Sequence, residues 1–175
     1  LVGLLEPVRV ALAKLSCIRR EASLVVNLLT SGPDMLLRSD GALEQADRDT
    51  LIGFARAHDL ARVSWARANG LPETVCLLRA TQANMSGVPV VPPPGGFLQA
   101  TITAEQAIGA AVVAGLPAKR TAKARVAELF AGCGTISFAL APHVRVAAYE
   151  GDGAAFAALR SAARLPTVAG RVEAF

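Results

Sequence analysis

The chain has 175 residues, enough for one ordinary domain or for a small unit joined to part of another. Its hydrophobic content of 53% excludes a disordered chain, and no stretch approaches the eighteen apolar residues of a transmembrane helix. The formal net charge of +4 and the pI of about 9.4 give weak support for an anionic partner such as RNA. Three widely spaced cysteines, Cys17, Cys76 and Cys133, argue against a disulfide framework or a metal site and predict a reduced, cytoplasmic protein.

The first half of the chain predicts a small α+β segment, residues 1–96. It begins with Leu1 and has no signal peptide, so we expect a piece of a longer protein. Apolar spacing predicts helices over residues 1–15 and 45–58. Residues 22–29 and 35–38 predict a hairpin around Ser31-Gly32-Pro33-Asp34. Further strands are predicted at residues 61–66, 74–78 and 88–91.

A proline run, Pro92-Pro93-Pro94-Gly95-Gly96, forbids helix and predicts the boundary of a second domain, residues 97–175. A helix is predicted from about residue 104 to 116. A basic connector follows, with Lys119, Arg120, Lys123 and Arg125. It reads either as a solvated linker or as a contact to an RNA backbone.

From residue 125 onwards the pattern becomes strand, loop, helix, strand, helix, strand. The strands are predicted at residues 125–130, 144–149 and 171–175, and the helices at 135–141 and 153–163. This order is the start of a doubly wound parallel sheet of the Rossmann-like α/β class. Because such a short sheet leaves edges unpaired, we expect the domain to continue past Phe175.

The loop in this pattern carries the chemistry. Gly132 and Gly134 let a ligand approach the backbone, and Glu128 and Glu150 lie at the ends of the two flanking strands. A strand-end carboxylate can accept ribose hydroxyls, whereas Glu128 would repel a pyrophosphate. Ser137 also stands where a dinucleotide fingerprint has its third small residue. The pattern therefore favours cationic S-adenosylmethionine over NAD, although an NAD-binding oxidoreductase fragment and a plain structural turn remain alternatives.

These segments resemble the RNA (uracil-5-)-methyltransferases. The resemblance rests on Phe97-Leu98-Gln99-Ala100, on the run from Glu128 to Thr135, and on Tyr149-Glu150-Gly151-Asp152. It implies a truncated methyltransferase domain that uses S-adenosylmethionine to methylate C5 of a uridine, with ribosomal RNA as the favoured substrate. The cofactor-binding residues that the motif and the resemblance give are Gln99, Glu128, Phe130, Gly132, Gly134, Thr135 and Glu150.

The resemblance also implies that the 175 residues lack the family's catalytic groups. The family's nucleophilic cysteine and its carboxylate base lie far beyond the glycine loop, so no catalytic residue is assigned and the chain alone is expected to be inactive. A 4Fe-4S cluster is implied only for sequence upstream of Leu1. Cys133 is interpreted as a small loop filler, because no neighbouring base lowers its pKa. A non-catalytic RNA-binding module remains a further alternative, and the oligomeric state stays open.

Overall fold

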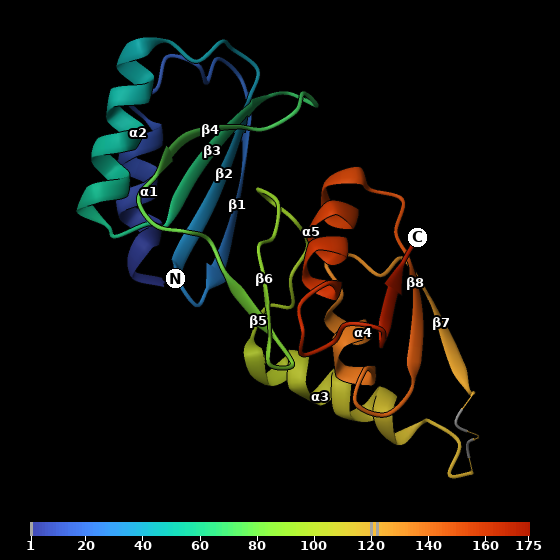
Figure 1. Cartoon of the computed structure of the whole chain (residues 1–175). Coiled ribbons are helices and arrows are strands. Elements are labelled where there is room, and N and C mark those ends of the chain that lie inside the picture. The colour runs from blue at the N-terminus through green and yellow to red at the C-terminus, as the bar shows by residue number, and fades with distance from the viewer. Residues whose placement is uncertain (1, 120, 122) are drawn as a thin grey trace. The chain divides into compact units, whose positions relative to one another are not determined.

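A computed structural model describes residues 2–119, 121 and 123–175 (Figure 1). Arg120 of the predicted basic connector lies outside the described residues. The chain forms two compact units, Leu1–Thr81 and Gln82–Phe175. This division lies upstream of the proline run at which the sequence suggested a boundary. The assignment of residues 97–175 as the cofactor domain stays a prediction.

The first unit is a four-stranded sheet with helices on one face (Figure 1). Its strands, in the order β1-β2-β3-β4, are β1 (Ala22–Leu29), β2 (Gly32–Ser39), β3 (Arg62–Arg67) and β4 (Glu73–Leu77). The helices are a 3-10 turn (Val2–Leu4), α1 (Leu5–Leu12) and α2 (Gln45–Ala57). The β1–β2 and β3–β4 pairs are antiparallel, whereas β2 and β3 are parallel because α2 crosses between them.

Two buried aspartates, Asp47 and Asp34, join separate elements of this unit through hydrogen bonds and an ion pair. The Asp47 carboxylate accepts hydrogen bonds from the Ser16 amide (2.7 Å), the Ser16 hydroxyl (2.9 Å) and the Cys17 amide (3.1 Å). These bonds tie the loop after α1 to the first turn of α2, so the helix predicted to reach residue 15 ends at Leu12. Asp34 forms a buried, bidentate ion pair with Arg62, its register partner on the neighbouring strand (2.8 and 2.6 Å).

The second unit contains the predicted parallel sheet. Its strands β7 (Arg125–Leu129), β8 (Arg145–Tyr149) and β9 (Val172–Ala174) lie in that order. The helices α4 (Thr135–Leu140) and α5 (Gly153–Ala163) connect them, and α3 (Ile102–Ala114) precedes them. A hairpin of β5 (Ala83–Met85) and β6 (Val88–Val90) completes the unit. The α/β class predicted from the sequence is confirmed.

The β5–β6 hairpin belongs to this unit because of its turn and its apolar side chains. Ser86 and Gly87 both have positive φ (51° and 87°), as a two-residue primed turn requires. The Gly87 amide donates to the Asn84 side chain (2.7 Å). Met85 and Val88 are buried in the same apolar core as the strands and helices of the parallel sheet.

The two faces of the parallel sheet differ. Val146, Ala148 and Val172 are buried in the core that includes residues of α4 and α5. The alternate residues, such as Arg145 and Glu173, are exposed. Because parallel strands in register place paired residues on the same side, the helices of the described residues cover one face and leave the other open (Figure 1).

Candidate cofactor-binding site

The glycine loop joins the end of β7 to the start of α4. Phe130, Gly132 and Gly134 all have positive φ (59°, 57° and 98°), so the chain turns sharply three times within five residues. The Ala131 amide donates to the carbonyl of Tyr149 (3.0 Å), which attaches the loop to the end of β8. The loop is therefore held at the carboxyl edge of the sheet, where sheets of this kind bind ligands.

The two glycines are required for different reasons. A Cβ atom on Gly134 would lie 2.5 Å from a ring carbon of Phe138 and 2.7 Å from a methyl of Leu159. A Cβ atom on Gly132 would meet no atom within 4 Å. Gly134 thus permits close packing of α4 and α5, whereas Gly132 faces open space that a ligand can enter.

Glu150 connects the two strands at this edge. One of its carboxylate oxygens accepts from the Gly132 amide and the other from the Asp152 amide, both at 2.6 Å. An ionised carboxylate has about four acceptor sites, so it retains acceptor capacity for a ligand. Asp152 caps α5 by accepting from the Ala154 and Ala155 amides (3.1 and 2.8 Å), which fixes the backbone that holds Glu150.

Glu128 lies near the end of β7, just before the loop, and is half-buried. The hydroxyl of the fully buried Ser137, one turn into α4, donates to its carboxylate. Burial raises the pKa of Glu128 above its usual value, and the hydrogen bond from Ser137 offsets only part of that effect. Among the described residues, Glu128 has no cationic partner. A cation bound beside it would stabilise its ionised form.

The remaining predicted residues are distributed less tightly. Phe130 projects from the loop with 90% of its surface exposed. Thr135 begins α4, and its hydroxyl contacts the sulfur of Met85 (3.6 Å). Gln99 is half-buried in the segment before α3, and its neighbour Leu98 packs against the core of this unit. None of the described hydrogen bonds of the glycine loop comes from Gln99.

Cys133 fits the interpretation as a loop filler. Its side chain is only 4% exposed, and burial, followed by the charges of Glu150 and Asp152, raises the pKa of its thiol to about 11. The thiol is therefore protonated near neutral pH and is a poor nucleophile.

Sequence reasoning missed the roles of two residues. Ser137 entered only as evidence against a dinucleotide fingerprint, yet it holds Glu128. Asp152 appeared only as part of a motif, although an acid just before a helical run is an N-cap signal.

The described residues contain no group of three possible metal ligands, and none of their helices is long and apolar enough to span a bilayer.

The fold of the chain resembles that of solved methyltransferases of the Rossmann-like class. It is similar to a tRNA m1G37 methyltransferase of M. jannaschii, with a TM-score of 0.59 and 15% identity, over 99% of this chain and 50% of that one. A Pyrococcus abyssi tRNA (uracil-54, C5)-methyltransferase, solved with S-adenosyl-L-homocysteine, gives a TM-score of 0.56 and 11% identity over 86% and 38% of the two chains.

Two curated RNA methyltransferases are similar to the chain in sequence. An uncharacterized RNA methyltransferase of Mesorhizobium japonicum is 38% identical over 173 residues, 98% of this chain and 40% of that protein. A 23S rRNA (uracil(1939)-C(5))-methyltransferase of Tolumonas auensis is 30% identical over 141 residues, 81% of this chain and 31% of that protein. No protein-family model matches. The chain is thus similar to RNA methyltransferases over most of its own length, and it spans 40% or less of the length of these two relatives.

Proposed function

We propose that this chain supplies the first part of the S-adenosylmethionine site of an RNA methyltransferase that methylates C5 of a uridine. The observation that carries the proposal is the bridge from Glu150 to the Gly132 amide, which joins the carboxyl ends of β7 and β8 around an open glycine loop. The cofactor supplies a methyl group on a positively charged sulfur. The residues described below bind and orient it.

The donor set fits this cofactor better than it fits a dinucleotide. Glu150 offers its remaining acceptor sites to the ribose hydroxyls, and Glu128 offers a negative charge to the cationic part of the cofactor. The carboxylate of Glu128 would repel a pyrophosphate placed on the same loop. The Ser137 hydroxyl could not donate to that pyrophosphate, because it already donates to Glu128. Phe130 gives an exposed ring against which a planar or apolar group can pack. We propose Gln99 and Thr135 as further contacts on the basis of the family resemblance alone.

The relatives' names support RNA as the substrate, and one of them supports ribosomal RNA and uracil C5. The nucleophilic cysteine and the base that this chemistry requires have no match in the 175 residues, so we propose that the chain alone does not methylate RNA. A 4Fe-4S cluster remains a proposal for other parts of the protein, because Cys17, Cys76 and Cys133 do not form a metal-ligand group among the described residues. A cytoplasmic location is proposed because the three widely spaced cysteines predict a reduced protein.

Calorimetric titration of the chain with S-adenosylhomocysteine tests the cofactor site. Glu150→Gln keeps the shape of the side chain but not both acceptors, so we expect affinity to fall about tenfold or more, as for loss of a charged hydrogen bond. Glu173→Gln, an exposed acid on β9, is the matched control and should bind like the unsubstituted chain. Saturable binding of NAD, or equal affinity in the Glu150 variant, would contradict the proposal. If the folded chain does not bind S-adenosylhomocysteine, the glycine loop is not a cofactor site within these 175 residues, and the proposal fails.

A further inference from the structure

Three arginines form a row across the parallel sheet. Arg125 on β7 is the register partner of Arg145 on β8. Val146 pairs with Val172, so the preceding residues Arg145 and Arg171 also lie side by side at the start of β8 and β9. With about 4.8 Å between neighbouring strands, the row is about 10 Å across.

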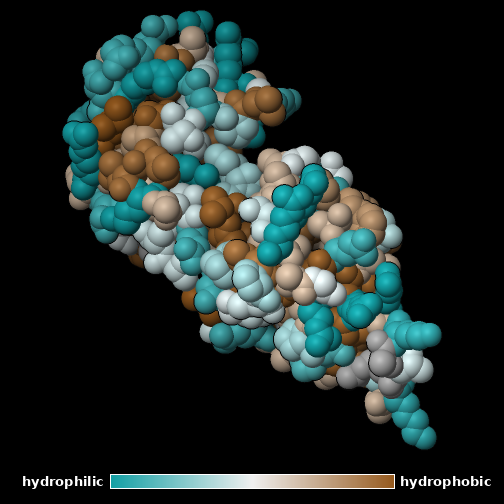
Figure 2. Space-filling view, in the orientation of Figure 1, coloured by the Kyte–Doolittle hydropathy of each residue, from teal (hydrophilic) through white to brown (hydrophobic). Residues whose placement is uncertain are grey.

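A cavity of about 480 Å³ adjoins this row. Its lining includes Arg145, Arg171 and His143, together with the small residues Ala124 and Gly170. No acidic side chain is among the described residues that line it. Figure 2 shows hydrophilic residues gathered at the end of this unit where the chain enters β7.

The arrangement is unfavourable in the absence of an anion. Like charges directly opposite each other on neighbouring strands destabilise a sheet. Within the residues that the structure describes, no ion pair involves Arg125, Arg145 or Arg171. All three are exposed, so each guanidinium is available to bind an anion.

The row is separate from the proposed cofactor site. It lies at the amino ends of the strands, whereas the glycine loop lies at their carboxyl ends. From Arg125 to Leu129 the strand extends about 13 Å, at about 3.3 Å per residue. A molecule that contacts both edges must therefore extend over at least this distance.

We propose that Arg125, Arg145 and Arg171 bind backbone phosphates of the RNA substrate away from the nucleotide that is modified. This inference rests on the proposed function, which makes RNA the substrate. The planar guanidinium matches phosphate oxygens with two parallel hydrogen bonds, and a linear row of cations matches a polyanion. Such contacts position the RNA without reading its sequence.

Fluorescence anisotropy of a labelled single-stranded RNA, titrated with the 175-residue chain at several salt concentrations, tests the inference. We expect Arg145→Gln/Arg171→Gln to weaken binding about tenfold or more. The slope of log affinity against log salt should also become shallower by about 1.4, at about 0.7 per phosphate contact. The double lysine variant keeps the charges and should keep most of this slope, which guards against a folding defect in the glutamine variant.

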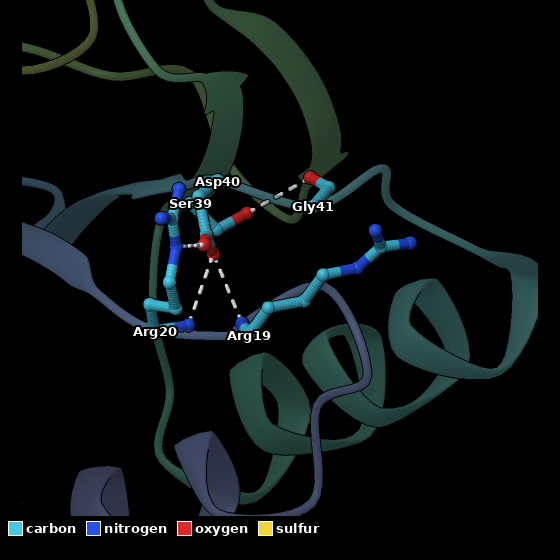
Figure 3. A network of polar contacts seen from close by, with 5 residues as sticks. All are labelled: Arg19, Arg20, Ser39, Asp40 and Gly41. Atoms are coloured by element: carbon cyan, nitrogen blue, oxygen red, sulfur yellow. Dashed lines mark hydrogen bonds and ion pairs between the residues drawn. The ribbon is translucent and has the colours of Figure 1, made fainter.

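The charge-matched control removes two other exposed arginines. The Arg19 and Arg20 amides donate to Asp40 (2.9 and 3.5 Å), and the Arg20 side chain is 87% exposed (Figure 3). Arg19→Gln/Arg20→Gln lowers the net charge by the same amount, and we expect affinity to change less than about threefold. Equal loss in both double variants would overturn the inference in favour of diffuse charge.

Two further outcomes separate the sources of phosphate. Saturable binding of inorganic phosphate that needs Arg145 and Arg171, without binding of RNA, would mean a free-anion site and would overturn the inference. Failure of a folded chain to bind RNA would also overturn it. Titration with S-adenosylhomocysteine in the same variants keeps the two proposals apart, because the row and the glycine loop lie at opposite edges of the sheet.

Discussion

Replacing each loop glycine by alanine should separate packing from ligand access. At both positions the backbone has a left-handed conformation, and an alanine in this conformation destabilises the folded state by about 1–2 kcal/mol. At Gly134 the Cβ also meets Phe138 at 2.5 Å and Leu159 at 2.7 Å, and overpacking of this kind adds about 1–3 kcal/mol. We therefore expect Gly134→Ala to destabilise the second unit by about 2–5 kcal/mol and Gly132→Ala by about 1–2 kcal/mol.

Urea unfolding followed by far-ultraviolet circular dichroism measures this difference. Trp65, the one tryptophan of the sequence, lies on β3 and reports separately on the first unit. Among folded variants, Gly132→Ala should weaken the binding of S-adenosylhomocysteine more than Gly134→Ala does. The reason is that the new Cβ at position 132 occupies the open space beside the loop. A Gly134 variant as stable as the Gly132 variant would refute the packing argument. Unchanged affinity for S-adenosylhomocysteine in Gly132→Ala would refute the ligand-access argument.

Three titratable groups give further predictions. Burial raises the pKa of Asp47, but the hydrogen bonds that its carboxylate accepts lower the pKa by more, so the net pKa is below the usual value. The ionised carboxylate therefore stabilises the folded chain fully above the unfolded pKa of about 3.9, and this stabilisation is lost as pH falls through the folded pKa. Asp47→Asn should remove that part of the acid dependence in urea unfolding measured from pH 7 downwards. Glu128 has the opposite sign: its raised pKa makes stability fall as pH rises from about 4.3 to the folded pKa, and Glu128→Gln should abolish this fall in the same assay. The Cys133 thiol, with a pKa of about 11, should react with a disulfide reagent at pH 8 more slowly than the half-buried Cys76; equal rates in the folded chain would contradict its burial.

Local patterns predicted most elements of the second unit because each strand is a short apolar run bounded by glycine, proline or charge. The strand β5 was missed, since Ala83–Met85 has only three residues and no β-branched side chain. It forms because the Ser86-Gly87 turn reverses the chain and Met85 enters the core. That stabilisation comes from residues distant in sequence, which a local pattern does not contain.

The same limit applies to pairing and to the site. The sequence predicted neighbouring strands in the first unit but not the parallel register of Asp34 with Arg62, which depends on the path of α2. It placed Glu128 and Glu150 at strand ends, because strand length and the glycine loop set those positions. It did not show their partners, Ser137 and the Gly132 amide, because hydrogen bonds across elements depend on how the elements pack.

The two loop carboxylates differ in a way that gives them different tasks. Glu150 already accepts hydrogen bonds from two backbone amides, so its position is fixed for hydroxyl donors before a ligand arrives. Glu128 is buried, has one hydroxyl donor and has a raised pKa, so its ionised form gains most from an added cation. If the cationic cofactor binds beside Glu128, its binding should release a proton near the raised pKa, and calorimetry in buffers of different ionisation enthalpy measures that release. The release should disappear in Glu128→Gln but persist in Glu173→Gln, and its persistence in the Glu128 variant would place the cation elsewhere.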